Sequence, residues 1–526
     1  MYFMKNIALF AGHDANITFS DTEKNKHHVI EIERLVKKRY FRLHVDNSQE
    51  EIFNILSTCQ SIAKKHFGMD DEYDTLTIVS DGGGISFDIL NKIFPFKKLN
   101  NFDHHLCHAA SVFYQSPFED SLIISYDGGG NDGFFNVYKA DDNGVIPIAS
   151  IESDFGGGYL LLSSCCSEVT KGSRHQLSLA GKLMGLCAYG NVDYKKVELM
   201  KSFFVDKNYK KLSSSLNCNL KNLNHPWKNP LENYIFEGQE SFDFAANAQK
   251  SYETMFIEIF EELIRLYPSK NICLTGGGSL NVLLNQRLKD EYDLNFFVAP
   301  NPNDCGLSLG ASFLNSPPKQ KVNIAYNGIP LLDGDETDRL LTGRKTSSLD
   351  LDYVSKLLKE GKIIGVCRND SEVGPRALGN RSIICDPSFK DMKDILNSKV
   401  KFREWYRPFA PFCLKEDAHL YFDSKDFDNM EFMSYAPLVK NEYRNLLPSI
   451  THVDGSSRLQ VVTEESHKFF FDLLKCYSKY SDIRVLLNTS FNIRGNPILT
   501  TIEDALYVLD NTDLDCVIIN DIIIEK

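Results

Sequence analysis

Short apolar runs that lead into loops with glycine or aspartate recur along the chain, and they limit its fold more than any other feature. Each run has the length and composition of a buried β-strand. The runs are residues 7–11, 76–79, 121–126, 271–275, 363–367 and 484–487. Between them, apolar residues recur at helical spacing, as in residues 252–266 and 465–477. Alternating strands and helices predict a mixed α/β fold.

The chain is long enough for more than one domain. It has 526 residues, of which 43% are apolar and 25% are charged, as in ordinary globular proteins. Residues 315–352 lack a clear period and contain three prolines and Gly334, which is typical of a connection between domains. We therefore predict two domains, residues 1–345 and 346–526. Residues 201–240 are polar and predict an insertion or a surface loop system.

Charge and cysteine content narrow the function. The net charge of −13 disfavours a general affinity for nucleic acid or for an anionic membrane. Thirteen cysteines, an odd number with no C-x-x-C pair, fit neither a disulfide framework nor a zinc ribbon and favour reduced thiols in a cytoplasm. No run of about 18 apolar residues indicates a transmembrane helix. We expect a soluble cytoplasmic protein that makes no membrane contact.

Three glycine-rich turns follow predicted strands, at Gly12-His13-Asp14, Asp127-Gly128-Gly129-Gly130 and Gly276-Gly277-Gly278. Glycines at a strand end let backbone N–H groups approach an anion, and a nearby aspartate can hold a metal ion. One such turn is more often only a tight turn. Three together favour a nucleotide or phosphate cleft of the kind found in sugar kinases and actin-like ATPases. His13 could accept a proton from a substrate hydroxyl or could simply pair with Asp14, and the residues alone favour neither reading.

His104 and His108 are four residues apart, so on a helix both rings project from one face and can share a metal ion. A carboxylate must complete such a site, and Asp127 and Asp304 are the candidates. The alternative is an ordinary polar pair of histidines. No glutamate follows the first histidine as in H-E-x-x-H, so a metalloprotease would lack its general base.

Basic residues crowd into residues 372–407 of this acidic chain, at Arg376, Arg381, Lys399, Lys401, Arg403 and Arg407. Guanidinium groups bind phosphate bidentately, so the segment is a candidate nucleotide or acyl-phosphate pocket. A solvated basic face is the alternative. Further along, Arg458 and the loop with Ser490 and Asn492 supply more hydrogen-bonding groups.

Taken together, these segments resemble the O-carbamoyltransferase family of nodulation-factor, cephamycin and aminoglycoside biosynthesis. The resemblance spans almost the whole chain in family order. Its most specific pieces are HHLCHAAS, SYDGGGNDG, GKLMGLCAYG, LTGGGSLN, EVGPRALGNRSI, KFREWYRPFAPF, THVDGSSR and LNTSFNIRGNP. Eight ordered segments of this specificity make coincidence very improbable.

The resemblance implies a fold and an activity. The first domain would be actin-like and sugar-kinase-like, similar to the tRNA threonylcarbamoyl-transfer ATPase, and the second would be YrdC-like. Such enzymes form carbamoyl-adenylate from carbamoyl phosphate and ATP, with Mg²⁺ accompanying the ATP. They then transfer the carbamoyl group to a hydroxyl of a small metabolite or sugar. The sequence does not name the acceptor. For the oligomeric state we expect a homodimer.

The resemblance also implies site residues. His104, His108 and Asp304, with Asp127 beside them, would hold a divalent metal ion, iron(II) in the first place and manganese or zinc as alternatives. His13 would be the catalytic base, and Asp127 is grouped with it as catalytic. The predicted nucleotide and carbamoyl-adenylate contacts are Arg376, Lys401, Arg407, Arg458, Ser490, Asn492, Arg39, Gly277 and Gly278.

The chain departs from the family pattern in one segment that bears on the nucleotide. Where the family usually has a Lys-His pair, this chain reads Lys37-Lys38-Arg39-Tyr40, so Arg39 or Lys38 would take over that contact. Three other functions stay open. They are a tRNA threonylcarbamoyl-type transferase, a sugar-kinase-like phosphotransferase and a catalytically silent binding subunit.

Overall fold

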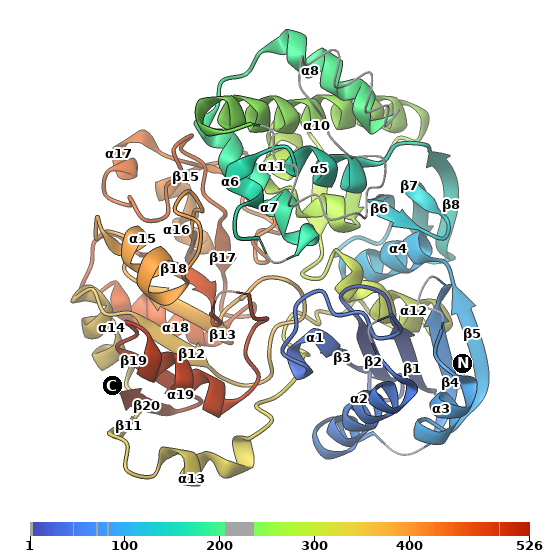
Figure 1. The fold of residues 1–526 in the computed structure, drawn as a ribbon, viewed down its shortest axis with the longest axis horizontal. Coiled ribbons are helices and arrows are strands. Elements are labelled where there is room, and N and C mark those ends of the chain that lie inside the picture. Colours follow the sequence, from blue (N-terminus) through green and yellow to red (C-terminus); the bar gives the residue numbers. More distant parts are fainter. Residues whose placement is uncertain are drawn as a thin grey trace.

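The computed structural model describes residues 4–45, 47–69, 72–80, 84–173, 175–205, 236–493 and 495–526. The described chain is a mixed α/β protein with three large sheets (Figure 1), which confirms the predicted fold class. Most of the insertion predicted at residues 201–240 lies outside the described residues. Among the described residues, every helix is too short or too polar to cross a membrane.

The first sheet has five strands in the order β3-β2-β1-β4-β5. They are β1 (Lys5–Phe10), β2 (Asn16–Asp21), β3 (Lys26–Glu31), β4 (Tyr73–Val79) and β5 (Phe96–Phe102). The central strand β1 runs antiparallel to β2 and parallel to β4. The short loop between β1 and β2 carries His13 and Asp14, so the sheet places both residues at one of its ends.

The second sheet repeats this arrangement with the order β10-β9-β6-β7-β8. Its strands are β6 (Ser121–Gly130), β7 (Gly133–Asp141), β8 (Gly144–Ile151), β9 (Asn271–Thr275) and β10 (Asn295–Val298). Its central strand β6 runs antiparallel to β7 and parallel to β9, as β1 does with β2 and β4. The matching strand order agrees with a duplication of this unit. The similar glycine-terminated strands in the sequence are a weak sign of the same duplication.

Two helices lie between these sheets, α4 (His104–Gln115) and α12 (Leu307–Asn315) (Figure 1). They pack on each other, with α12 also against β1, β2 and β4 and α4 against β6. Small residues allow close contact, since a Cβ at Gly310 of α12 would lie 1.8 Å from the Cys107 carbonyl oxygen of α4. Ser308 and Ser312 of α12 bond to Thr18 and Ser20 of β2 at 2.7 Å each. The helices therefore join the two sheets rigidly.

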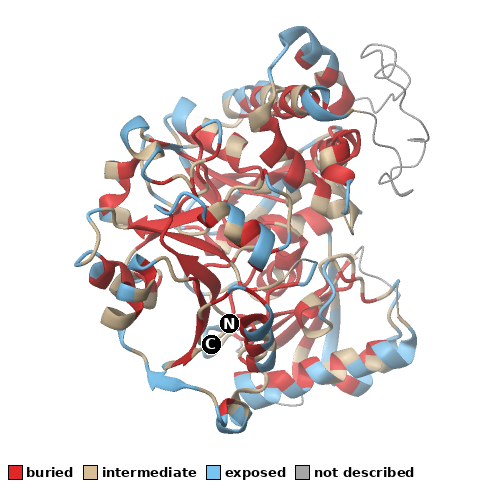
Figure 2. Ribbon diagram, turned by 60° about the vertical axis from the view of Figure 1, so that its left-hand side comes forward, coloured by how far each residue is buried: buried red, intermediate tan, exposed pale blue. Residues whose placement is uncertain are grey.

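The third sheet has eight strands in the order β11-β20-β19-β12-β13-β18-β14-β17. They are β11 (Thr346–Ser348), β12 (Ile364–Cys367), β13 (Arg381–Cys385), β14 (Ala410–Leu414), β17 (Gln460–Val462), β18 (Val485–Ser490), β19 (Cys516–Ile519) and β20 (Ile522–Glu525). Most of its strands are buried (Figure 2). Phe470 of the helix predicted at residues 465–477 stacks on Phe412 at 4.0 Å and is a core residue, whereas Phe469 and Phe471 are half-buried against the same core.

Shorter elements complete the fold. The helices of the first half are α1 (Ile32–Leu35), α2 (Gln49–Ile62), α3 (Phe87–Ile93), α5 (Phe155–Ser163), α6 (Ser167–Thr170), α7 (Leu179–Leu186), α8 (Tyr194–Lys201), α10 (Gly238–Leu266) and α11 (Val282–Glu291). Later in the chain come α13 (Thr337–Leu341), α14 (Leu351–Lys359), α15 (Met392–Ile395), α16 (Lys415–Tyr421), α17 (Asn441–Arg444), α18 (Lys468–Tyr477) and α19 (Ile502–Asn511). A small sheet pairs β15 (Phe422–Asp423) with β16 (Leu438–Val439).

The connection predicted at residues 315–352 packs closely on the second half of the chain. Val373 donates its N–H to the Ala325 carbonyl at 2.9 Å, and Ser371 donates to Ile329 at 2.8 Å. These bonds pair the connection with residues 371–373, which precede the predicted Arg376 contact. The boundary near residue 345 stays a prediction.

Candidate metal centre and anion site

The helix α4 brings two histidines together. His104 is its first residue and His108 follows one turn later, so both rings lie on one face. Their Nε2 atoms are 3.1 Å apart. Gly130 leaves space for this arrangement, because a Cβ there would lie 2.8 Å from the His104 side chain. The His104 backbone N–H donates to Asn131 Oδ1 at 3.0 Å, which ties the helix start to the β6–β7 turn.

Two aspartates from distant segments complete the group. Asp127 lies in the glycine-rich end of β6, with Oδ2 3.3 Å from His108 Nε2. Asp304 begins the turn before α12, with Oδ1 3.4 Å from His108 Nε2 and 3.6 Å from His104 Nε2. One ligand atom from each of the four residues lies within 4.8 Å of the others, and all four residues are buried. We call these four residues the metal group.

The donors of the metal group fit a divalent cation. Two imidazole nitrogens and two carboxylate oxygens suit iron, manganese and zinc alike. Burial lowers the pKa of His108, but hydrogen bonds to Asp127 and Asp304 outweigh it and raise the pKa to about 9. Without a cation, a proton on His108 helps to balance the carboxylates, and metal binding would release it. The structure therefore contains a possible metal-binding site, and its residues do not select one metal.

His13 lies beside the metal group at the β1–β2 loop. Its Nε2 is 3.3 Å from Asp304 Oδ2, and its Nδ1 is 3.2 Å from Asp14 Oδ2. Burial lowers the pKa of His13, but Asp304 and Asp14 together raise it to about 10. About 30% of the His13 side chain is exposed, so it is more accessible than either Asp304 or Asp14. A substrate can thus reach the imidazole, and the charges of the neighbouring carboxylates set its pKa.

Five basic side chains of the second half form a cationic cluster, which we define as Arg376, Lys401, Arg403, Arg407 and Arg458. Burial and repulsion from Arg407 lower the pKa of Arg376 to about 10. Burial and the charges of Arg376 and Arg407 hold the pKa of Arg458 well below its usual range. The buried Nε of Arg458 has no hydrogen-bond partner in the described part of the chain. Cations held together in this way bind an anion such as phosphate.

Lys401 shapes one wall of the cluster. Its Nζ donates to the Ser490 carbonyl at 2.5 Å, to Ser490 Oγ at 3.2 Å and to the Asn492 carbonyl at 2.9 Å. Burial, followed by the charges of Arg403 and Arg407, holds the pKa of Lys401 well below its usual range. The three predicted residues are therefore assembled in one place, where Lys401 orients the loop that carries Ser490 and Asn492.

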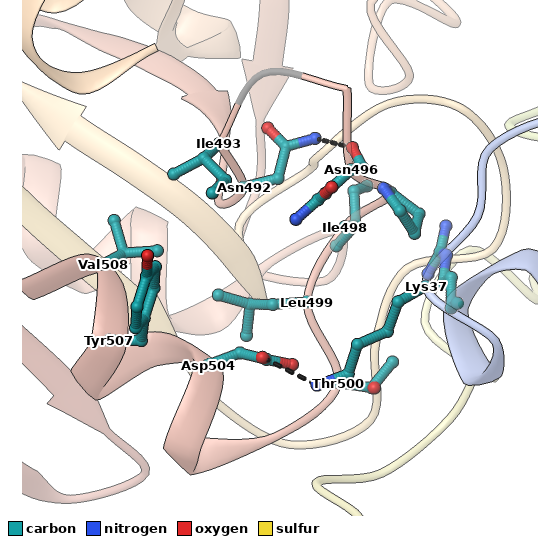
Figure 3. A pocket seen from close by; sticks show the side chains of 12 residues that line it. Lys37, Asn492, Ile493, Asn496, Ile498, Leu499, Thr500, Asp504, Tyr507 and Val508 are labelled. Atoms are coloured by element: carbon teal, nitrogen blue, oxygen red, sulfur yellow. Dashed lines mark hydrogen bonds and ion pairs between the residues drawn. The ribbon is translucent and has the colours of Figure 1, made fainter. Parts of the chain in front are cut away.

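A cavity of about 340 Å³ opens beside Asn492 (Figure 3). It lies where the two halves meet, between the residues after α1 and the segment that leads into α19. Lys37 of the first half pairs with Asp504 of the second at 2.8 Å across it. The other lining residues are Arg34, Ile493, Asn496, Pro497, Ile498, Leu499, Thr500, Tyr507 and Val508. Its size is at the lower end of small-molecule sites.

Arg39 and Tyr40 lie between the metal group and the cationic cluster. The Arg39 guanidinium donates to the Tyr40 hydroxyl at 2.9 Å, and the Tyr40 ring stacks on His175 at 4.6 Å. Burial raises the pKa of Tyr40, while the charge of Asp14 raises it further and that of Arg407 lowers it, so both sites are within electrostatic reach. Tyr40 has a φ of +57°, a strained conformation typical of functional segments.

Gly277 and Gly278, predicted to contact nucleotide, lie beside Asp127 and Tyr126 in this structure. The Gly277 N–H donates to Asp127 Oδ2 at 2.6 Å. A Cβ at Gly278 would lie 2.4 Å from the Tyr126 ring, so only glycine fits there. Their role in nucleotide binding stays a prediction, whereas their effect on the position of Asp127 is visible.

Sequence reasoning missed several residues of these sites. Tyr40 has no local signal, because its strained backbone is not readable from residue types. Lys182 lies within the GKLMGLCAYG segment and pairs with Glu404 of the KFREWYRPFAPF segment at 2.8 Å. Arg403 was predicted only as one of several basic residues in its segment. It belongs to the cationic cluster and donates to Asn397 Oδ1 at 2.8 Å. For Lys182, Arg403 and Glu404, the available signal was their place in a family-specific segment.

Two family models match the chain. The Carbamoyltransferase N-terminus model matches residues 10–313, and the Carbamoyltransferase C-terminus model matches residues 355–526. The chain belongs to the carbamoyltransferase family. The metal group lies within the N-terminal match, and the cationic cluster lies within the C-terminal match.

Curated relatives of this carbamoyltransferase family member include nodulation proteins. It is 31% identical to nodulation protein NolO of Bradyrhizobium diazoefficiens, a match that covers 81% of this chain and 79% of NolO. It is also 31% identical to nodulation protein NolNO of Sinorhizobium fredii, covering 80% of this chain and 63% of NolNO. The match thus spans less than two thirds of that longer relative.

Solved structures with a partial likeness include two of HypF. The structure of T.kodakarensis HypF has a TM-score of 0.35 and 15% identity, and it covers 59% of this chain and 47% of that chain. Full-length HypF in the phosphate- and nucleotide-bound form has a TM-score of 0.34 and 14% identity, and it covers 60% and 57% of the two chains. Likenesses of this size carry no functional argument.

Proposed function

We propose that this protein is an ATP-dependent O-carbamoyltransferase with two linked sites. The cationic cluster would form carbamoyl-adenylate, and the site at His13 would pass the carbamoyl group to a hydroxyl of a small metabolite or sugar. One observation carries the proposal. A cluster of mutually repelling cations, in which Lys401 is buried and the four arginines are half-buried, lies across Arg39 and Tyr40 from a histidine base candidate beside a buried metal group.

The first step takes place at the cationic cluster. Carbamoyl phosphate and water give carbamate and phosphate, and a carbamate oxygen then attacks the α-phosphorus of ATP. The products are carbamoyl-adenylate and pyrophosphate. Arg376, Arg407 and Arg458 would neutralise the charge that develops on the phosphates, and relief of their mutual repulsion favours the bound state. The cavity beside Asn492 offers room for the nucleoside part.

The second step takes place at His13. The acceptor oxygen attacks the carbamoyl carbon, its proton passes to His13 Nε2, and AMP leaves with the bonding electron pair. A divalent metal ion in the metal group would polarise the carbamoyl carbonyl and offset the carboxylate charge that raises the pKa of His13. Asp14 orients the imidazole through Nδ1. His13 Nε2 faces Asp304 Oδ2 at 3.3 Å, and a metal ion held by Asp304 would make Nε2 available to the substrate hydroxyl.

The other functions explain fewer observations. A sugar-kinase-like phosphotransferase would use the glycine-rich turns but would leave the cationic cluster without a role. A tRNA threonylcarbamoyl-type transferase needs an exposed basic surface, whereas Lys401 and the Arg458 Nε atom are buried. A silent binding subunit does not require the complete set of metal donors and cations that this chain retains.

The test of the proposal measures pyrophosphate release from ATP with and without carbamoyl phosphate. We expect release that requires carbamoyl phosphate and that falls at least about 100-fold in the Arg376→Ala variant, as when one charge-stabilising donor is removed. Arg344→Ala is the matched control. Arg344 forms an ion pair with Asp510 at 2.7 Å, and this pair is not part of the cationic cluster. ADP as the sole nucleotide product would instead support a kinase. No pyrophosphate from folded, metal-loaded protein would contradict the two-step reaction.

The acceptor can be sought once adenylation is established. Hydroxylated metabolites, among them sugars and oligosaccharides, would be screened for AMP formation that depends on the added compound. We expect at least one such acceptor to be carbamoylated on oxygen, and mass spectrometry would show the added carbamoyl group. Carbamoylation of tRNA but of no small hydroxyl compound would favour the alternative transferase.

A further inference from the structure

The loop between β12 and β13 carries Arg376 and is anchored on both sides of that residue. On the N-terminal side, Gly374 has a φ of +111°. A Cβ at Gly374 would lie 2.1 Å from the Pro300 carbonyl oxygen, so this glycine presses against the segment that leads to Asp304. The loop is therefore in contact with the first half of the chain at the point where it turns toward the cationic cluster.

The buried carboxylate of Glu372 holds the C-terminal side of the loop. Its Oε1 accepts hydrogen bonds from the N–H groups of Leu378, Gly379, Asn380 and Arg381 at 2.7, 2.9, 2.8 and 3.1 Å. Glu372 itself is fully buried. A buried carboxylate with four donors is a strong local anchor, and it fixes the shape of the loop only if the Glu372 backbone is itself held in place.

Two residues of the first half hold that backbone. Arg34 donates from Nη1 to the Glu372 carbonyl at 2.5 Å and from Nη2 to the Gly374 carbonyl at 2.8 Å. Glu31 accepts the Gly374 N–H on Oε1 at 2.9 Å and forms a close charge pair with Arg34. Arg34 is only 3% exposed. The Glu31–Arg34 pair thus closes on the loop from the opposite half, and we call it the clasp.

We propose that Glu31 and Arg34 are positioning residues for Arg376, so that the first half of the chain completes the adenylation pocket of the second. This inference rests on the proposed adenylation. The physical reason is repulsion. Arg376 lies within electrostatic range of Arg407 and Arg458, whose like charges repel it, and a loop that is anchored at one side only would let Arg376 move away. The planar guanidinium of Arg34 reaches both backbone carbonyls at once, which a lysine ammonium does less well.

The experiment compares Arg34→Met with Arg287→Met in the full chain. Arg287 of α11 also forms charge pairs, with Glu253 and Glu291, but it lies outside the cavity and outside both sites. We expect Arg34→Met to reduce kcat/KM for carbamoyl-phosphate-dependent pyrophosphate release about 10- to 100-fold, and Arg287→Met to change it less than twofold. Arg34→Lys should lie between Arg34→Met and the natural protein.

A double variant separates positioning from a general structural effect. If Arg34 acts through Arg376, Arg34→Met should add almost nothing to Arg376→Ala, because the positioned group is already gone. Multiplicative losses in the double variant would overturn the proposal. So would Arg34→Met protein with the activity of the natural protein.

Hydrogen exchange tests the clasp without turnover. In Arg34→Met, we expect faster exchange of the N–H groups of Gly374 and residues 378–381, with no change in β1 or β18. Unchanged exchange in the loop would contradict the clasp even if the enzyme loses activity. If the natural protein releases no pyrophosphate but the loop exchanges faster in Arg34→Met, the positioning of the loop stands and the proposed function fails, so the two failures are distinguishable.

Discussion

At the scale of single residues, opposite charges compete in the buried space around His13. Two carboxylates, Asp127 and Asp304, lie among three imidazoles within hydrogen-bond or ion-pair distance. Burial raises the pKa of Asp127, but the hydrogen bond to His108 reverses this shift and leaves the pKa below its usual range. The site therefore depends on compensating charge, which a metal ion can provide in place of protons.

Asp304→Asn should weaken metal binding because it removes one of the two carboxylate ligands. In the natural protein, we expect added manganese or iron(II) to stabilise the folded state by about 2.7 kcal/mol at 100 times the dissociation constant. The variant should lose most of this gain in a thermal unfolding experiment. The bound metal measured after dialysis should fall in parallel. An equal thermal shift in both proteins would contradict the metal group.

His13→Asn should separate the two proposed steps. The cationic cluster is intact in this variant, so pyrophosphate release should stay within about twofold of the natural rate. Transfer to a hydroxyl acceptor should fall by about 10² to 10⁴, the range for loss of a general base. The two rates would be measured on one preparation with an acceptor found by screening. Equal losses of both rates would argue against a base that serves only transfer.

At the scale of elements, helix ends and loops carry most of the constraints. His467 caps α18, accepting the Phe470 N–H on Nδ1 at 3.1 Å, and its Nε2 is 3.1 Å from Asn380 Oδ1. An imidazole that accepts on one nitrogen and donates on the other must be neutral. Burial accordingly lowers the pKa of His467 to about 4. The cap of α18 and the end of the Arg376 loop therefore share one neutral histidine.

Lowering the pH should reduce the free energy of unfolding, because His467 is neutral in the folded protein. Between about pH 6.5 and 4, the unfolded chain binds a proton at this residue while the folded chain does not, so the free energy of unfolding falls as the pH falls. The full effect is about 3 kcal/mol. His467→Asn keeps a capping side chain that does not titrate and should unfold with a shallower pH dependence. Exposed His419→Asn is the control, and equal pH slopes for His467→Asn and the natural protein would contradict the assignment.

At the scale of the whole molecule, side chains from both halves interlock. Lys182 of α7 pairs with Glu404 at 2.8 Å with both side chains nearly buried. Tyr406 donates its hydroxyl to the Glu168 carbonyl at 3.2 Å, and His452 Nε2 lies 2.8 Å from the Gly185 carbonyl oxygen. Together with the clasp, these contacts hold the cationic cluster against the first half. The two sites therefore belong to one rigid arrangement.

Lys182→Met should destabilise the protein by about 1–3 kcal/mol, because it removes the closer cation from the Glu404 carboxylate and leaves the longer contact to Arg407 at 3.7 Å. The double variant Lys182→Met with Glu404→Gln should recover part of this loss, since the poorly compensated charge is removed. Thermal unfolding of the single and double variants would measure both effects. A double variant that is less stable than Lys182→Met would show that the charge pair is not the cause.

Much of the fold and of the site follows from local patterns. The apolar runs predict the strands β1, β4, β6, β9, β12 and β18, and the helical period predicts α18, because both periods act over a few residues. The spacing of His104 and His108 alone places two ligands on one helix face. The family segments then identify Asp127 and most of the cationic cluster, since their order along the chain is itself specific. Asp304 lies outside the quoted segments and was predicted as a candidate carboxylate ligand through the family resemblance.

The sequence by itself determined the fold class, the pair of histidines on one helix face and the concentration of basic residues in one segment, because these depend on residue types at short spacing. Only the tertiary structure decided which distant groups meet. Arg34 reaches Glu372 across 338 positions, and Asn16 bonds to Asp304 across 288. The strain at Tyr40 arises in the same way. Such contacts result from how strands and helices pack, and no local period records them.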